Sequence, residues 1–282
     1  MKYLWIIPVV LLALFGLYLW MILPLNKRRH RMQPFLRHYI AHRGLHGAGI
    51  PENSMAAFAA AVEAGYAIEL DVQRTADGKL MVFHDKTLRR MCGVKGALYK
   101  TKSAALARLP LQGTGEGIPY LLDVLRLVRG RVPLVIEVKT WGKYREIGAA
   151  LHRLLRGYPG VYCIQSFDPR ILSWFRRHSP QTLRGQLSTD FYKSGMDAPT
   201  GTRFFLTNLM CNFLSRPDFI SYDHSYENQF TFRLCRRLFR PCCAAWTIRS
   251  AAQLQAAREN FELFIFEGFA PNRENDDAYE NG

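Results

Sequence analysis

Nine short apolar runs, separated by stretches of helical character, constrain the fold of this chain more than any other feature. Each run has the length and the composition of a buried strand. Strands that alternate with helices predict a parallel sheet, because each helix carries the chain back to start the next strand. The runs cover residues 39–41, 67–72, 80–83, 134–138, 161–166, 183–187, 219–222, 244–248 and 263–266.

The first two runs are joined by an explicit helix. Pro51-Glu52-Asn53-Ser54 leads into an alanine-rich stretch, 55–64, with Asn53 or Ser54 as its cap and Gly65 as its stop. At 282 residues and 49% hydrophobic content, the chain can form one large α/β domain, and a (β/α)8 TIM barrel is the predicted closure. Nine strands are predicted, but the barrel has eight, so one of the nine is expected to lie outside the barrel. The turn pair Asp77-Gly78 favours an antiparallel hairpin at that point.

The amino-terminal segment differs in kind from the rest. Residues 3–26 carry no charge, and 5–23 are almost entirely apolar. A helix needs about 20 such residues to cross a bilayer. The alternative, a cleaved signal peptide, is disfavoured because no small-x-small site follows and the run exceeds a signal core of about 7–15 residues. We therefore predict one transmembrane helix over residues 1–26.

A basic cluster follows this helix directly, in a segment (27–38) predicted to be a juxtamembrane linker. Only Lys2 and the terminal amine precede the helix, so the positive-inside rule predicts a single-pass membrane protein with its carboxyl-terminal side in the cytoplasm. The +15 formal charge predicts attraction to an anionic leaflet or a solvated face, without any nucleic-acid motif. The cluster consists of Lys27, Arg28, Arg29 and Arg31.

Two smaller features complete the outline. The six cysteines lack Cys-x-x-Cys pairs and the density of a disulfide scaffold, which predicts free thiols in a reducing cytoplasm. The tail, 272–282, is polar and acidic without apolar period, and we expect it to be flexible.

Acidic residues recur at one edge of the predicted sheet. Glu69 and Asp71 are two residues apart in a strand, so their carboxylates point to the same side and could share a cation. Glu137 in the run 134–138 offers a third oxygen ligand. Mg²⁺ and Ca²⁺ prefer such ligands, and Mn²⁺ is a further candidate. Lys139 lies two residues beyond Glu137 and is expected to face the same anionic substrate.

A set of short motifs in fixed order resembles the glycerophosphodiester phosphodiesterase family, in its membrane-anchored bacterial form. The resemblance runs from about residue 39 to 271. It implies the TIM barrel, catalytic groups at the carboxyl ends of its strands, and a small insertion at about 86–119 over the mouth. The motifs are His42-Arg43-Gly44, Pro51-Glu52-Asn53-Ser54, Glu69-Leu70-Asp71-Val72, Asp77-Gly78, His84-Asp85, Ile118-Pro119, Glu137-Val138-Lys139, Ser166-Phe167 and Trp246-Thr247.

The resemblance also implies roles for individual residues. It places the catalytic histidines at His42 and His84, a suitable acid/base pair because imidazole titrates near working pH. Arg43 and Lys139 are expected to contact phosphate oxygens. Trp246 is expected to pack against the glycerol or alcohol moiety, or to be a buried barrel residue.

The chain departs from the family pattern at two positions. Arg249 stands where the family commonly has asparagine, and Glu267 stands where an aspartate is common. Both lie at the last strands. They bear on substrate preference more than on catalysis.

The predicted activity is metal-dependent hydrolysis of glycerophosphodiesters to glycerol 3-phosphate and an alcohol. Internal attack by a glycerol hydroxyl, through a cyclic phosphate, and direct attack by water both remain open. One alternative is a lysophospholipase D acting on membrane lysophospholipids. Others are a catalytically silent, membrane-tethered headgroup-binding module and, more weakly, a nucleic-acid phosphodiesterase. The complete set of two histidines and three acids counts against the silent module.

Overall fold

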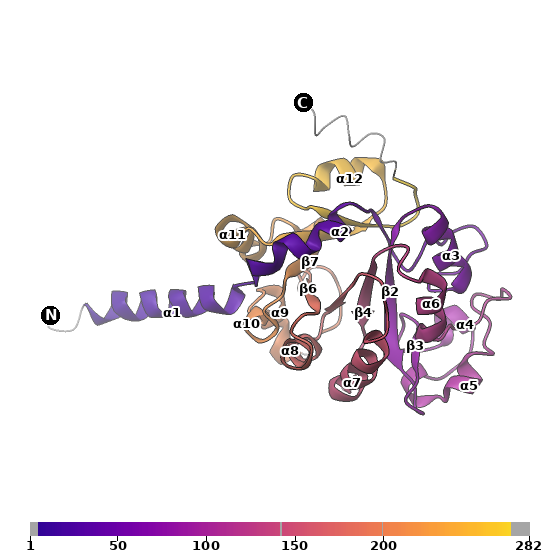
Figure 1. Cartoon of the computed structure of the whole chain (residues 1–282). Coiled ribbons are helices and arrows are strands. Elements are labelled where there is room, and N and C mark those ends of the chain that lie inside the picture. Colours follow the sequence, from indigo (N-terminus) through magenta and orange to yellow (C-terminus); the bar gives the residue numbers. More distant parts are fainter. Residues whose placement is uncertain (1–4, 142, 199, 272–282) are drawn as a thin grey trace.

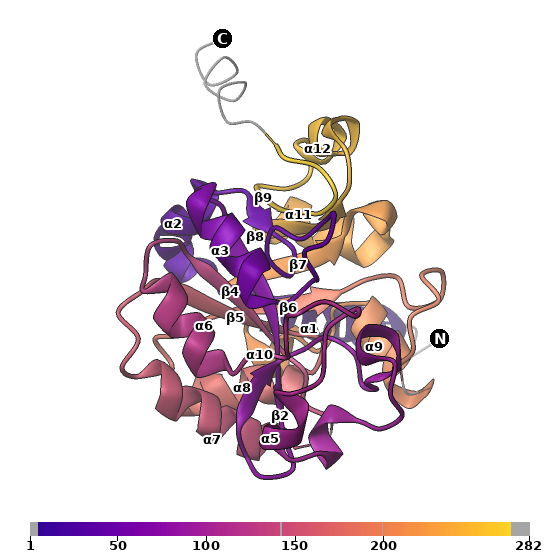
Figure 2. The same ribbon diagram turned by 90° about the vertical axis from the view of Figure 1, so that its right-hand side faces the viewer.

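Eight parallel strands close into a barrel in the computed structural model, which describes residues 5–141, 143–198 and 200–271 (Figures 1 and 2). The first strand pairs with both the second and the last, and this double pairing closes the sheet. The predicted TIM barrel is confirmed. Its strands in the described residues are β1 (Ile40–Ala41), β2 (Ala67–Arg74), β4 (Leu134–Val138), β5 (Tyr162–Ser166), β6 (Leu183–Ser188), β7 (Phe219–Asp223), β8 (Cys242–Ile248) and β9 (Leu263–Phe266).

The remaining strand, β3 (Leu80–Val82), is the peripheral one. It pairs antiparallel with the end of β2, with Val72 opposite Val82 and Arg74 opposite Leu80. The turn between them contains Gly78 at φ +84°, a conformation that glycine adopts without strain. The expected hairpin is therefore confirmed, and it carries the chain directly to His84.

Helices surround the barrel (Figure 2), and the longer ones bury an apolar face. The first of them begins at Ser54, whose Oγ accepts a hydrogen bond from the backbone N–H of Ala57 at 3.1 Å, which confirms the predicted cap. The outer helices are α3 (Met55–Glu63), α6 (Leu121–Val128), α7 (Tyr144–Leu155), α8 (Pro169–His178), α9 (Thr200–Thr207), α10 (Asn212–Ser215), α11 (Phe230–Phe239) and α12 (Ala251–Ala257), with a short 3₁₀ turn η3 (His224–Tyr226) before α11.

The segment 86–119 between β3 and α6 has a small core of its own. Its apolar side chains, Leu88, Met91, Leu98 and Leu106 among them, pack with Phe83 next to His84. The segment thus rests against the loop that carries the second histidine. Its elements are α4 (Arg89–Cys92), η2 (Leu98–Lys100) and α5 (Ser103–Leu106).

The residues expected to link the membrane helix to the barrel form two helical turns, η1 (Asn26–Met32) and α2 (Gln33–Leu36), which cover one end of the barrel. Met32 and Phe35 are fully buried there, against Ile40, Ala67 and other side chains that point into the barrel. The segment 27–38 is therefore part of the barrel packing.

The basic residues of this segment bond to the barrel as well. Arg28 donates from Nε to Oδ1 of the buried Asp218 at 2.7 Å. Arg29 pairs with Glu262 at 3.1 Å, and Arg31 donates to a backbone carbonyl. These basic side chains thus attach the segment to the barrel, in addition to the bias that the sequence predicts for the orientation of the chain in the membrane.

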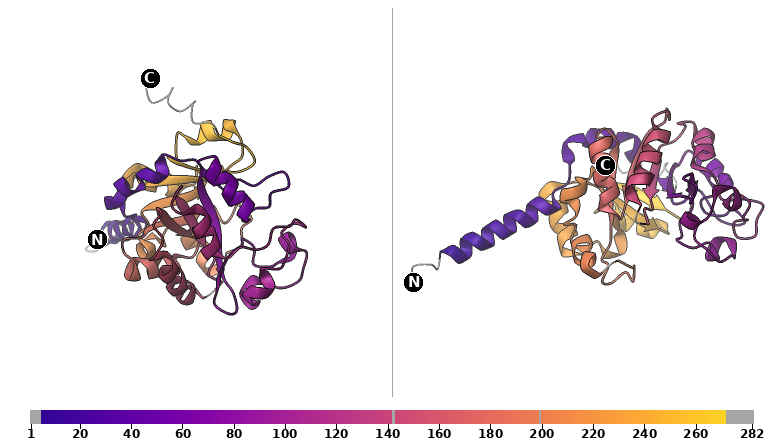
Figure 3. Two further views of the ribbon diagram at one scale, coloured as in Figure 1. Left: turned by 45° about the vertical axis from the view of Figure 1, so that its right-hand side comes forward. Right: turned by 90° about the horizontal axis from the view of Figure 1, so that it is seen from below.

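Helix α1 (Ile6–Ile22) projects away from the barrel (Figures 1 and 3). Among the described residues, one helical segment, Ile6–Leu36, is long and apolar enough to cross a membrane, and only 6% of its most apolar window is buried. Length and composition fit a membrane anchor and a signal sequence equally. Residues 1–4, the start of the expected membrane segment, lie outside the described residues. So does the segment 272–282, which was expected to be flexible.

Candidate active site

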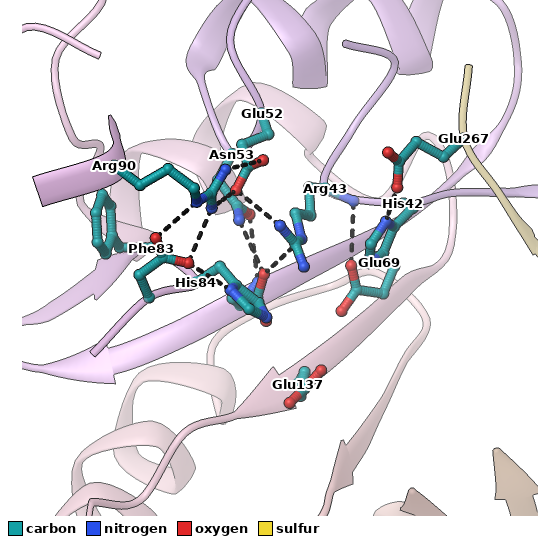
Figure 4. A network of polar contacts seen from close by, with 12 residues as sticks. His42, Arg43, Glu52, Asn53, Glu69, Phe83, His84, Arg90, Glu137 and Glu267 are labelled. Carbon is teal, nitrogen blue, oxygen red and sulfur yellow. Dashed lines mark hydrogen bonds and ion pairs between the residues drawn. The ribbon is translucent and has the colours of Figure 1, made fainter. Parts of the chain in front are cut away.

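Three buried carboxylates meet at the carboxyl ends of β2 and β4. Asp71 and Glu137 are register partners on these adjacent parallel strands, and Glu69 lies two residues before Asp71 on the same face. All three are at most 7% exposed, and one oxygen from each lies within 4.8 Å of the others. The structure therefore brings together the three predicted metal ligands, and Figure 4 labels two of them, Glu69 and Glu137.

The donor chemistry of this cluster suits a divalent cation. Burial and the neighbouring charges of Asp71 and Glu137 raise the pKa of Glu69 well above its usual range. Oδ1 of Asp71 and Oε1 of Glu137 are buried, and both pair with the ammonium of Lys139. A cluster of hard oxygen ligands that repel one another is stabilised by a cation, and Mg²⁺, Ca²⁺ or Mn²⁺ would fit.

Lys139 lies against this acid cluster. Its ammonium pairs with Glu137 and is 3.1 Å from Oδ1 of Asp71. Burial opposes its charge, but the two carboxylates outweigh burial and raise the pKa of Lys139 above its usual value. The ammonium thus neutralises the acids in this structure, at the position where the sequence predicted a phosphate contact.

His42 follows β1 and is held by the end of β9. Its Nδ1 lies 2.6 Å from Oε2 of Glu267, and Arg249 lies 3.5 Å from the same oxygen. Burial, assisted by the charge of Arg43, lowers the pKa of His42 to about 4, although Glu267 opposes this shift. The hydrogen bond from His42 lowers the pKa of Glu267 to about 2. A neutral imidazole that donates from Nδ1 to a carboxylate leaves Nε2 free as an acceptor.

His84 lies in the loop after β3 and has its own carboxylate partner. Its Nδ1 is 2.7 Å from Oδ1 of Asp85. The backbone of this loop is held by Gln73 of β2, whose Nε2 donates to the carbonyls of Phe83 (2.7 Å), His84 (3.1 Å) and Asp85 (2.8 Å). Gln73 is fully buried, so a rigid strand positions the loop.

Arg43 lies between the acid cluster and the amino end of α3. Its backbone N–H donates to Glu69 at 3.1 Å, its guanidinium donates to Glu52 at 2.8 Å, and its Nε is 3.4 Å from Asp71 (Figure 4). The next residue must be glycine, since a Cβ at Gly44 would lie 2.9 Å from backbone and side-chain atoms of Ala57. This close approach presses the histidine loop against α3.

Four residues for which the sequence predicted no role in catalysis or binding support the site. Asn53 donates from Nδ2 to Asp71 at 2.9 Å, and Glu52 pairs with both Arg43 and Arg90. Glu52 and Asn53 belong to a motif of the resemblance, and Gln73 continues the two-residue period of Glu69 and Asp71. Glu267 was noted only as a departure from the family pattern. The sequence thus contained a pattern that pointed to each of these residues, but which side chain each one contacts depends on the fold.

Every predicted site residue except Asp71 lines one cavity of about 1230 Å³ at the barrel mouth. Trp246 lies on its wall, with its ring edge-on to Phe167 at a centroid distance of 5.7 Å. Its indole N–H is buried and has no hydrogen-bond partner in the described residues. The cavity therefore combines acids, two histidines, basic side chains and an available donor.

Comparisons with known proteins agree on one family. The family model described as "Glycerophosphoryl diester phosphodiesterase family" matches residues 42–260. A glycerophosphodiester phosphodiesterase of Caldanaerobacter subterraneus subsp. tengcongensis is 39% identical over 109 residues, which cover 36% of this chain and 44% of that protein. The first relatives are all matched over less than half of their own length.

Two further matches extend over most of the chain. The putative glycerophosphodiester phosphodiesterase YhdW of Bacillus subtilis is 29% identical over 77% of this chain and 89% of its own length. The structure of an Oleispira antarctica phosphodiesterase in complex with the product sn-glycerol-3-phosphate superposes with a TM-score of 0.69. It covers 83% of this chain and 94% of that one at 24% identity, which supports the shared fold.

Proposed function

The chain belongs to the glycerophosphoryl diester phosphodiesterase family, and from this membership we propose that it is a divalent-metal-dependent hydrolase of glycerophosphodiesters. The products would be glycerol 3-phosphate and an alcohol. The observation that carries the proposal is one cavity that combines the cluster of Glu69, Asp71 and Glu137 with two histidines, each bonded to its own carboxylate. This arrangement supplies charge neutralisation and proton transfer side by side.

The acid cluster would hold the cation, which supplies Lewis-acid stabilisation of charge on the phosphoryl oxygens when it is bound. His42 is the proposed base, because Glu267 occupies its Nδ1 and leaves Nε2 to take a proton from the attacking oxygen. His84 is the proposed acid, because Asp85 occupies its Nδ1 and leaves Nε2 as the atom that would pass a proton to the leaving alcohol.

Binding of the phosphate is assigned to three further residues. The unpaired indole N–H of Trp246 can donate to a substrate oxygen at no cost in existing hydrogen bonds. Arg43 and Lys139 line the same cavity and provide positive charge, although both also pair with carboxylates. With a divalent cation held by the acid cluster, the Lys139 ammonium would be available to pair with a substrate oxygen.

We further propose that α1 is a retained, single-pass anchor with the barrel in the cytoplasm. Packing at the end of the helix supports retention, because Ile22, the last residue of α1, is fully buried in the apolar core and cleavage after the helix would expose its partners. The basic flank and six free thiols support the cytoplasmic side. Protease digestion of inside-out and right-side-out vesicles tests the orientation, since only the exposed barrel is cut.

The activity is tested on the full chain in lipid nanodiscs with glycerophosphocholine. Hydrolysis is expected with Mg²⁺, Ca²⁺ or Mn²⁺ and not after chelation. A folded chain that turns over no glycerophosphodiester with any of the three ions contradicts the proposal. Binding without turnover would instead identify a silent headgroup-binding module, and turnover of DNA or RNA alone would identify a nucleic-acid phosphodiesterase.

A further inference from the structure

The cavity at the barrel mouth is amphipathic. One end holds the acid cluster and the two histidines, and the other end is an apolar arm that runs toward the end of α1. We propose that this arm binds the acyl chain of a single-chain phospholipid, so that the substrate is a membrane lysophospholipid as well as a water-soluble diester. The inference rests on the proposed function and names its substrate class.

The inner part of the arm is a series of aromatic rings. Trp246 lies beside the catalytic groups and contacts Phe167 edge-on at 5.7 Å between ring centroids. Phe167 in turn contacts Phe191 at 5.9 Å. All three rings line the cavity, so an apolar wall leads directly out of the catalytic centre. A polar headgroup alone would not make favourable apolar contacts with this wall.

The outer part of the arm is formed by the connection from β6 to β7 together with α1. Phe205, Leu206 and Phe213 line it from α9 and α10, and Met21 lines it from α1. The helix end is fixed to this wall, because the rings of Trp20 and Phe213 lie 5.4 Å apart.

Hydrogen bonds fix the same junction. Asn212 donates from Nδ2 to the carbonyl of Ile22 at 2.9 Å, and Arg216 donates to the carbonyl of Leu23 at 2.9 Å. The end of the apolar helix, and with it the surface of the bilayer in which it would sit, is therefore held beside the open end of the arm.

Size and chemistry both favour a single acyl chain as the occupant. The cavity of about 1230 Å³ exceeds the roughly 300–1,000 Å³ of ordinary small-molecule sites. A lysophospholipid also keeps a free hydroxyl next to the phosphate, as a glycerophosphodiester does. Hydrolysis would break the bond between phosphorus and the headgroup oxygen. Water supplies the new oxygen on phosphorus and the proton of the released alcohol, which leaves lysophosphatidate.

The test uses the full chain in nanodiscs and short lysophosphatidylcholines that differ by two methylenes and stay below micelle formation. Glycerophosphocholine is the substrate without a chain. Each methylene bound in the arm should raise kcat/KM by about fourfold, until the arm is full. Partition into the nanodisc also favours longer chains, so a variant must separate the two effects.

Phe205 and Phe204 provide a matched pair for this purpose. They are neighbours on α9, half exposed, and packed against each other at 5.8 Å, but only Phe205 lines the cavity. In Phe205→Asp, the increase in kcat/KM per methylene should fall to the value that partition into the nanodisc alone gives. Turnover of glycerophosphocholine, which has no acyl chain, should be unchanged. Phe204→Asp should behave as the wild type, because partition is the same for both.

The outcomes separate the two proposals. Suppose that glycerophosphocholine is hydrolysed but kcat/KM does not depend on chain length in the wild type, or depends on it equally in all three proteins. Either result overturns the acyl-chain site and leaves the proposed function standing. If no diester is hydrolysed, the proposed function fails. Calorimetric binding of the same series to the wild type and to Phe205→Asp then decides the acyl-chain site independently, since binding that ignores chain length rejects it.

Discussion

Nδ1 of His42 lies 2.6 Å from Oε2 of Glu267, so the last strand of the barrel orients the histidine that follows the first. The two residues are 225 positions apart in the chain. They meet because β1 and β9 pair in register, with Ala41 opposite Phe266. His42 directly follows Ala41, and Glu267 directly follows Phe266. Glu267 is therefore a positioning residue in the proposed mechanism.

Removal of this carboxylate should slow turnover without loss of the cavity. For Glu267→Ala we expect kcat to fall by about 10–100-fold, the usual cost of losing an orienting partner of a histidine. Glu267→Gln should recover part of the loss, because an amide oxygen still accepts from Nδ1. Arg249→Ala is the control, since Arg249 is exposed and 3.5 Å from the same oxygen. Wild-type kcat in Glu267→Ala would contradict the role.

The two histidines should be equally necessary. His42→Ala and His84→Ala are each expected to lower kcat by about 10²–10⁴-fold, the range for loss of a general acid or base. His46→Ala is the matched control, because His46 lies four residues from His42 but does not line the catalytic cavity. If His46→Ala were the damaging variant, the assignment of the catalytic pair would be wrong.

The acid limb of the pH profile should lie well below the usual pKa of histidine. The pKa of His42 is lowered to about 4, so the base is neutral at pH 5–8 and becomes protonated only as the pH falls through 4. We expect kcat/KM, measured at saturating metal, to fall near pH 4. Metal affinity is determined at each pH as the control. A limb near pH 6.5 in metal-saturated enzyme would contradict a buried neutral His42.

Metal binding should release protons and stabilise the fold. The pKa of Glu69 is raised by burial and by its acidic neighbours, so the metal-free cluster retains protons to higher pH than an exposed acid. Calorimetry in buffers of different ionisation enthalpy should detect a net release of protons when the ion binds. Saturation at 100 times Kd should add about 2.7 kcal/mol to the stability.

Glu69→Gln is the control for the metal prediction, because it removes the group that carries the proton. This variant should bind the ion more weakly and release fewer protons. Equal proton release by the variant and the wild type would place the proton elsewhere in the cluster.

The basic segment should contribute to the stability of the barrel. Arg28→Ala leaves the buried Asp218 without its charged hydrogen bonds from this segment and should cost about 1.5–3 kcal/mol. That loss corresponds to about 2–4 °C in Tm for each kcal/mol. Lys27→Ala removes the same charge from an exposed neighbour and should leave the Tm unchanged. Equal effects of the two substitutions would mean that the segment acts through charge alone.

Much of the fold was predictable because barrel strands are buried on both faces. Such strands appear as short runs rich in apolar residues, and the ends of each of the nine predicted runs lie within about two residues of the observed strand ends. The Asp77-Gly78 turn also identified the antiparallel hairpin. The motif order correctly indicated the family. These properties are local: they depend on composition, period and turn chemistry within a few residues.

The sequence by itself determined the alternation of strands and helices and the kinds of side chain at the strand ends. Only the tertiary structure decided which side chains are partners: Glu267 with His42, Gln73 with the His84 loop, and Arg28 with Asp218. It also placed Lys139 on the acids and joined the apolar arm to the end of α1. The physical reason is that hydrogen bonds and ion pairs depend on distances of about 3 Å, and barrel closure brings residues to that distance across more than 200 positions of chain.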